Sequence, residues 1–179
     1  MSLSHCLPRE WYARDALVVA RELLGMRLVR LLDGQPLHSV ITETEAYRGE
    51  EDQACHARSG RTPRTSVMSG PPGHAYIYFT YGMHWCLNAV CMPQDYPAAV
   101  LIRAVVPMNG IALISARRPG RPQADWTNGP AKLTQALGID KSLNGVDLTT
   151  TDDGLWIEIG QDVPEENVVI GPRVGINSV

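Results

Sequence analysis

The first periodic stretch of apolar residues in the chain has the spacing of an amphipathic helix. It covers residues 12–25, and its apolar positions are Ala13, Ala16, Leu17, Ala20 and Leu24. Gly25 follows the last of them and suits a helix C-terminal cap. Two further helices are predicted, a short one over 111–118 and one over 129–138 that has Pro130 in its first turn.

Alternating or continuous runs of apolar residues predict strands in the remainder of the chain. These runs cover residues 26–32, 40–47, 75–81, 85–92, 98–106, 155–159 and 168–170. Asp33-Gly34 is a tight-turn signal, so we expect the first two strands to form an antiparallel hairpin. The helices and strands do not alternate as they do in a doubly wound fold. We therefore predict an α+β fold over residues 1–179: a single compact domain with an antiparallel β-sheet core and flanking short helices.

The predicted strand over 40–47 carries two carboxylates. Strand alternation places Glu43, Glu45 and Tyr47 on the same face as Ile41. A carboxylate in a partly apolar site can act as a general base near neutral pH. Two solvated acids on an edge strand are the alternative interpretation, and this feature alone favours that alternative.

Three of the six tyrosines lie within six positions, and an arginine-bearing loop precedes them. Alternation along 75–81 puts Tyr76 and Tyr78 on one face and Tyr81 on the other. The preceding residues 48–74 form a long loop, and such loops in a compact domain are often functional. Aromatic rings beside basic groups are what a stacked base and its phosphates require. A tyrosine-rich strand packed in the core is equally compatible with the pattern.

Charge is unevenly distributed along the chain. The formal net charge is -3, yet residues 53–124 contain a single acid, Asp95, and seven arginines. Such a basic middle segment between acidic flanks is a candidate footprint for a polyanion. Folding can also mix these charges over the surface, which would leave no basic face.

Several protein classes are not indicated. No apolar run approaches the ~18 residues of a membrane span, and the first residues do not have the pattern of a secretory signal. The four cysteines form no C-x-x-C pair, and His56 has no second histidine at a metal-binding spacing. We therefore expect buried, reduced thiols, no metal site and no membrane association.

Two neighbouring segments are more specific. V-I-T-E-T-E-A-Y at 40–47 and D-Q-A-C-H-A-R at 52–58 resemble the alkyladenine (3-methyladenine) DNA glycosylase family. The hallmark of that family is a strand ending E-T-E-A-Y, followed by D-x-A-x-H. The match continues in the family order through residues 61–64, 73–78, 81–83, 86–88, 100–104, 129–133 and 173–175. The resemblance therefore covers nearly the whole chain.

The resemblance implies a base-excision enzyme that flips an alkylated or deaminated purine out of duplex DNA and hydrolyses its N-glycosidic bond. It implies that Glu45 is the general base. Arg103 and the backbone carbonyl of Val174 would help to place the attacking water. The only lysines are Lys132 and Lys141, neither in a matched catalytic position, so we expect a monofunctional enzyme that leaves an abasic site.

The resemblance also implies how the DNA is held. The residues that would stack around the flipped base are Tyr47, His56 and Tyr78. Asn88 would crowd the exocyclic amine of an undamaged guanine, and Tyr81 would fill the space that the base has left. The loop arginines expected at the DNA backbone are Arg58, Arg61 and Arg64. We expect no cofactor, a monomer, and a cytoplasmic location (on the nucleoid in a bacterium, in the nucleus in a eukaryote).

Two departures from the family pattern stand out. Ser69 occupies a position where relatives often have a bulky residue, and the chain stops soon after Val174, where we expect relatives to continue. Two other functions remain open at this point. A non-catalytic nucleic-acid-binding module would need neither Glu45 nor Arg103. A hydrolase of free nucleosides would need neither a wedge nor a basic loop.

Overall fold

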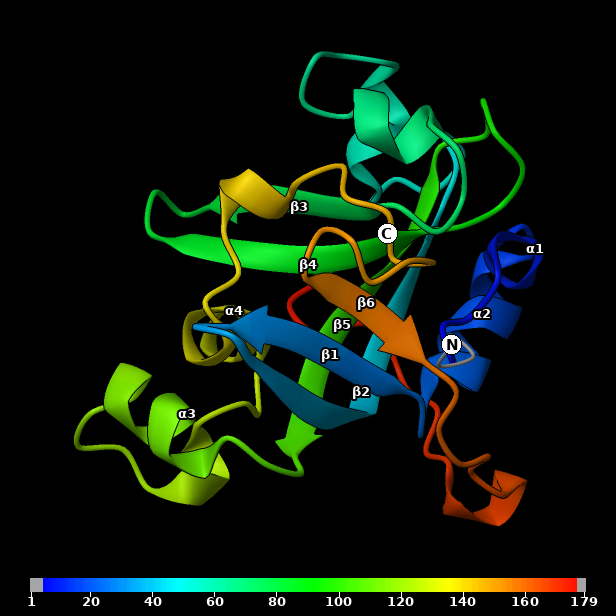
Figure 1. Ribbon diagram of the computed structural model, residues 1–179. Helices are drawn as coiled ribbons and strands as arrows, with labels where there is room; N and C mark the ends of the chain where they lie inside the picture. The colour runs from blue at the N-terminus through cyan, green and yellow to red at the C-terminus, as the bar shows by residue number, and fades with distance from the viewer. Residues whose placement is uncertain (1–4, 177–179) are drawn as a thin grey trace.

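One antiparallel sheet organises residues 5–176, the part of the chain that this computed structural model describes. Its strand order is β3-β4-β5-β2-β1-β6. The strands are β1 (Arg27–Leu32), β2 (Gln35–Arg48), β3 (Ala75–Thr80), β4 (His84–Val90), β5 (Ala98–Pro107) and β6 (Leu155–Glu158). Figure 1 shows that the sheet curls, so that β1 and β6 lie in front of β5. The predicted antiparallel core of an α+β fold is confirmed.

The helices are short and flank the sheet, as expected. They are α1 (Arg9–Tyr12), α2 (Ala16–Leu23), α3 (Ile111–Arg117) and α4 (Pro130–Leu137). Pro130 begins α4, and Gly138 ends it in the left-handed conformation, with φ of 61°. The long loop between β2 and β3 contains two single turns of 3-10 helix, at His56–Ser59 and Ser66–Ser69.

The helix predicted over 12–25 is shorter in the structure, where α2 covers only Ala16–Leu23, and this corrects the sequence prediction. The Asp15 carboxylate accepts a hydrogen bond from the Leu17 N–H at 2.9 Å and thereby caps α2. The buried side chains of α2 are Ala16, Val19, Ala20 and Leu23, and Leu17 is exposed instead. Gly25 follows the helix with φ of 86°, and a Cβ there would lie 2.0 Å from the Gln161 carbonyl oxygen.

A double irregularity in the pairing of β2 with β5 changes which residues of β2 face the core. Ile41 pairs with Val105 and Glu43 with Ala104, so β2 has one extra residue in this step. Between the pairs Glu43–Ala104 and Thr44–Ile102, the extra residue is in β5 instead. Ile41 lies in the main core, and Thr44 also points to that side, because its hydroxyl donates to a carbonyl of α2. The expectation that Ile41 shares a face with Glu43 is therefore wrong.

Two hydrophobic clusters cover the two sides of this sheet. The main core packs the sheet against α2 and α4, and its fully buried side chains include Leu23, Leu28, Leu37, Ile102, Leu133 and Leu137. A smaller cluster lies under the β2–β3 loop and consists of Cys55, Ala57, Met68, Tyr76, Val90 and Ala99. All four cysteines are buried. The smaller cluster fixes the long loop on the sheet.

Two of the predicted strands differ in the structure: one ends earlier, and the other does not form. β3 ends at Thr80, and Tyr81 begins the turn to β4 with φ of 52°. Residues 168–170 form no strand, because Val169 and Ile170 are 96% and 82% exposed and pair with nothing in the described chain. An apolar run of β-branched residues is thus insufficient where no sheet edge is available to it.

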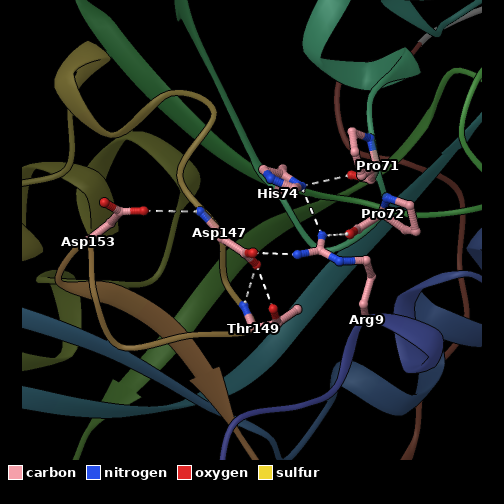
Figure 2. A network of polar contacts seen from close by, with 7 residues as sticks. All are labelled: Arg9, Pro71, Pro72, His74, Asp147, Thr149 and Asp153. Carbon is pink, nitrogen blue, oxygen red and sulfur yellow. Dashed lines mark hydrogen bonds and ion pairs between the residues drawn. The ribbon is translucent and has the colours of Figure 1, made fainter.

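A polar network ties α1 to the start of β3 and to the loop that precedes β6 (Figure 2). The Arg9 guanidinium pairs with Asp147, donates to the Pro72 carbonyl at 2.7 Å and lies 3.2 Å from Nδ1 of His74. Asp147 also accepts two hydrogen bonds from Thr149. The network therefore fixes the direction in which the chain enters β3, the strand that carries Tyr76 and Tyr78.

Candidate active site

A cavity of about 320 Å³ lies on the side of the sheet that faces the β2–β3 loop. Its floor is built from alternate positions of four neighbouring strands: Glu45 and Tyr47, Tyr76 and Tyr78, Cys86 and Asn88, Leu101 and Arg103. His56 from the loop, Tyr81 and the first turn of α4 add to the wall. Residues 160–176, which we call the C-terminal strap, close one side with Val174. One chain supplies the whole cavity.

Glu45 lies at the centre of the polar groups in this cavity. Its side chain is only 6% exposed. Oε1 accepts a hydrogen bond from the Val174 N–H at 2.6 Å and lies 3.3 Å from the Arg103 guanidinium, while Oε2 accepts one from the Tyr47 hydroxyl at 2.8 Å. These two hydrogen bonds and one ion pair stabilise a buried negative charge that water would otherwise have to solvate.

Arg103 is shared by two carboxylates. Its Nε donates to Glu43 at 3.0 Å, and its Nη1 lies near Glu45. The Arg103 side chain is 13% exposed, whereas that of Glu43 is 46% exposed. The two glutamates of the predicted strand therefore differ: Glu45 is buried in the cavity, and Glu43 lies at its edge and holds the guanidinium in place.

Aromatic rings form the wall beside Glu45. His56 meets the Tyr78 ring edge-on, with ring centroids 4.4 Å apart, and its Nδ1 lies 3.1 Å from the Tyr76 hydroxyl. Burial raises the pKa of Tyr78 and of Tyr47 well above the usual value, and for Tyr47 the hydrogen bond to Glu45 adds to this rise. Both hydroxyls therefore stay protonated near neutral pH and remain donors.

The protonation of His56 is set by its surroundings. Burial lowers the pKa of His56 from its usual 6.5, and the positive charge of Arg64 lowers it further by a smaller amount. The ring is consequently neutral at pH 7. The Arg64 guanidinium lies over the Tyr78 ring, 5.4 Å from its centre, so this arginine belongs to the rim of the cavity.

Asn88 and Tyr81 both line the cavity but differ in exposure. Asn88 is buried, and its amide donates to the Tyr76 carbonyl at 3.0 Å, which fixes its orientation. Tyr81 is 87% exposed at the tip of the β3–β4 hairpin, where Phe79 and Met83 are also exposed. The expectation that Tyr81 faces away from Tyr78 is wrong, since the turn brings both side chains to the same cavity.

The other two loop arginines have weaker contacts. Arg58 donates to the Gln53 carbonyl at 3.1 Å. Arg61 lies 3.9 Å from Asp95, and both side chains are mostly exposed. Their predicted role at a DNA backbone stays a prediction.

Four residues of the arrangement were given no individual role by the sequence prediction. Arg173 lies 4.8 Å over the Tyr47 ring and forms two hydrogen bonds with Asp52, from 121 positions away in the chain. No local pattern connects such distant residues. Cys86 and Tyr76 were likewise not assigned to the site, and only the strand register of β3 with β4 brings them to its floor.

Residues 5–176 contain no group of three side chains that could hold a metal ion. Within the same range, no helix has both the length and the apolar character needed to cross a membrane.

Comparison with known proteins identifies the family. Residues 10–179 match the family model described as Methylpurine-DNA glycosylase (MPG). A protein of Carboxydothermus hydrogenoformans is 52% identical over 172 residues, which are 96% of this chain and 89% of the relative. Relatives from Methanocella arvoryzae and Myxococcus xanthus are 47% and 48% identical, over 96% of this chain and 84% and 82% of their own lengths. All three carry the name "Putative 3-methyladenine DNA glycosylase".

These matches extend over both the strands that form the cavity floor and the strap that closes it. They agree with the resemblance that the motifs at 40–47 and 52–58 indicate. The protein is thus a DNA glycosylase of DNA repair, and its substrate is DNA. The chain belongs to the methylpurine-DNA glycosylase family.

Proposed function

We propose that this enzyme takes an alkylated or deaminated purine out of duplex DNA into the cavity and hydrolyses its N-glycosidic bond. Glu45 activates the water, and the product is an abasic site. The observation that carries the proposal is the environment of Glu45: its side chain is 6% exposed, lies beside an aromatic wall, and is held by two hydrogen bonds and an ion pair. An ionised group in that position suits both proton abstraction and stabilisation of a cationic sugar.

The donors leave one carboxylate oxygen more accessible to water than the other. A carboxylate offers about four acceptor sites, two on each oxygen. The Val174 N–H donates to Oε1 and the Arg103 guanidinium pairs with that oxygen at 3.3 Å, whereas only the Tyr47 hydroxyl contacts Oε2 among the described residues. A water bound at the remaining site of Oε2 gives its proton to Glu45 as its oxygen attacks the sugar carbon. The C–N bond breaks and its electron pair leaves with the base, while the negative charge of Glu45 opposes the oxocarbenium-like state.

The aromatic wall suits an electron-poor purine. Ring faces carry negative charge density and attract cationic or electron-poor partners. His56, being neutral, does not repel a cationic base, and its contact with Tyr78 holds both rings in place. Asn88 is fixed by its hydrogen bond to the Tyr76 carbonyl, and in this proposal it crowds the amine of a guanine. Tyr81 would fill the gap in the duplex, because an inserted ring keeps the flipped base out.

The remaining features support a monofunctional monomer. Neither Lys132 nor Lys141 lines the cavity, and Lys132 instead pairs with Asp125. A lyase step through a Schiff base would need an amine at the sugar. A single chain also supplies every residue of the cavity, so a second copy is not required.

The test is single-turnover cleavage of a duplex that contains one hypoxanthine, followed by alkaline scission. Wild type should produce alkali-labile sites, and Glu45→Gln should be slower by about 10²- to 10⁴-fold. Glu51→Gln is the matched control, because this carboxylate is exposed and lies outside the cavity. Binding of Glu45→Gln to a duplex with an abasic-site analogue should be unchanged.

A wild-type enzyme that does not cleave hypoxanthine is tested next on 3-methyladenine DNA. Failure on both substrates would overturn the proposal. Equal rates on a free modified nucleoside and on duplex DNA would favour a nucleoside hydrolase instead.

A further inference from the structure

The C-terminal strap brings an essential contact to the site although it has few attachments. Its first part is held by the Gln161 N–H on the Gly25 carbonyl and by Arg21, which contacts Val163 and Glu165. Among the described residues 169–176, the hydrogen bonds are made by Arg173 and Val174. The position of Val174 against Glu45 therefore depends on what holds Arg173.

Arg173 binds the Asp52 carboxylate, which backbone hydrogen bonds already hold in position. Asp52 is itself fixed by the Arg48 N–H at 3.1 Å and the Ala54 N–H at 3.0 Å, and it binds both terminal nitrogens of the guanidinium. Arg173 also donates to the Ala46 carbonyl at 3.1 Å. A two-pronged arginine–carboxylate pair fixes direction as well as distance, which a single contact cannot do.

The same guanidinium lies 4.8 Å above the ring of Tyr47. Arg173 thus connects the strap to the two residues that flank it in space, Asp52 in the loop and Tyr47 on β2. Its neighbour in the chain, Val174, places its N–H on Glu45 at 2.6 Å. Neither Asp52 nor Arg173 lines the cavity, so neither touches the reacting atoms.

We infer that Asp52 and Arg173 form a latch that holds the strap and places the Val174 N–H on Oε1 of Glu45. Both are positioning residues for the glycosylase reaction, and the inference rests on the role proposed above for Glu45. The latch fixes both hydrogen-bond donors of that carboxylate, the Val174 N–H through the backbone and the Tyr47 hydroxyl through the ring beneath the guanidinium.

The charges of the pair support a latch that stays closed at neutral pH. Burial acts to raise the pKa of Asp52, but the hydrogen bonds from Arg173 and from the backbone outweigh it, so the pKa is lowered. The hydrogen bond with Asp52 raises the pKa of Arg173. The side chains are 12% and 26% exposed, so salt screens this pair less than a surface pair.

The experiment compares Asp52→Asn, Arg173→Met and the double variant in single-turnover cleavage at saturating enzyme. Each single variant should be slower by about 10- to 100-fold, because a hydrogen bond to the charged Glu45 becomes loose. The double variant should be no slower than either single variant, since both break one latch. The Kd for a duplex with an abasic-site analogue should change less than about twofold.

Two further variants separate positioning from general stability. Arg173→Lys keeps the charge and should recover part of the rate. Arg21→Met removes another side-chain attachment of the strap, with its partially exposed ion pair to Glu165, and should leave the rate unchanged. Hydrogen exchange at the Val174 amide should speed up in Arg173→Met and not in Arg21→Met.

The outcomes distinguish this inference from the proposed function. If wild type cleaves, Glu45→Gln does not, and both latch variants retain the wild-type rate, the latch is overturned and the role of Glu45 stands. If rate, binding and thermal stability all fall together in both latch variants and in Arg173→Lys, the pair is merely structural and the inference is also overturned. A wild type that cleaves no damaged purine overturns the proposed function itself.

Discussion

The backbone N–H of Val174 donates to Oε1 of Glu45 at 2.6 Å, although 129 positions separate the two residues in the chain. Val174→Pro removes this donor and keeps the carbonyl. We expect single-turnover cleavage to slow by about 10- to 100-fold, because a hydrogen bond to a charged group contributes roughly 1.5–3 kcal/mol. Val174→Ala, which keeps the N–H and loses an exposed side chain, should cleave like wild type. Equal rates for the two variants would contradict the role of the N–H.

Tyr47 contributes the donor to the other oxygen of Glu45. Tyr47→Phe keeps the ring under Arg173 and removes the hydroxyl, so we expect a rate loss of about 10-fold with unchanged DNA affinity. Tyr96→Phe is the control, because its hydroxyl bonds Glu51 on the surface in a similar pair. Rapid-quench measurement on a hypoxanthine duplex gives the rates. A loss confined to affinity would show that the hydroxyl binds the base instead.

Tyr81 combines exposure with an unfavourable backbone conformation. A left-handed conformation disfavours non-glycine residues by about 1 kcal/mol, and such strain tends to persist at functional positions. Asn tolerates that conformation, so Tyr81→Asn should change the free energy of unfolding by less than about 0.5 kcal/mol. Cleavage should nevertheless fall at least about 10-fold, since the wedge is lost. Denaturant unfolding and cleavage assays check the two parts, and Leu17→Ala, exposed on α2, is the neutral control.

The pKa of His56 predicts how activity depends on pH. Because it lies below 6.5, the folded protein disfavours the protonated ring. The resulting stability is fully present above pH 6.5 and is lost as the pH falls through the lower folded-state pKa. A protonated His56 also repels a cationic base. Cleavage of 3-methyladenine should therefore fall more steeply on the acid side than cleavage of hypoxanthine, from about pH 8 to about pH 5. Parallel profiles, or a difference that survives His56→Gln, would refute this assignment.

The Arg9–Asp147 pair should contribute to stability without affecting chemistry. Burial acts to raise the pKa of Asp147, but hydrogen bonds from Thr149 and Arg9 lower it below 3.8. The contribution is therefore present above pH 3.8 and is lost as the pH falls through the lower folded-state value. Arg9→Met should reduce the free energy of unfolding by about 1 kcal/mol at neutral pH, and less in strong acid. Urea unfolding measures this, and a changed cleavage rate would link the network to the site.

The sequence predicted those parts of the fold that depend on local pattern. The strands of the central sheet, the turn at Asp33 and the helix from Pro130 to its glycine cap follow from periodicity and turn chemistry. The sequence prediction was wrong where a single side chain or a segment distant in the chain determines whether a helix or strand forms. Asp15 caps a helix that apolar spacing alone would begin earlier. At Val169, an apolar run lies in no sheet and is exposed, since it pairs with no strand of the described chain.

The site was predictable to the extent that it depends on motifs. The resemblance named Glu45, Tyr78 and Asn88, and the structure brings all three to one cavity. The partnership of Asp52 with Arg173 was not predictable, because it depends on how a strap without strands or long helices crosses the loop. Contacts of this kind carry no periodicity and become visible only in three dimensions.

The double irregularity between β2 and β5 has a consequence for how this chain tolerates change. Before it, odd-numbered positions of β2 such as Leu37 and Ile41 face the main core, and after it the odd-numbered Glu45 and Tyr47 face the cavity. The first half of this continuous strand therefore packs in the core, and its second half lines the cavity. Substitutions in the first half of β2 should change mainly the packing of the core, and those in the second half should change mainly the catalytic activity. Deletion of Thr42 would remove the extra residue of β2 and give simple alternation from Ile41 onward, which keeps Ile41 toward the core and Glu45 toward the cavity.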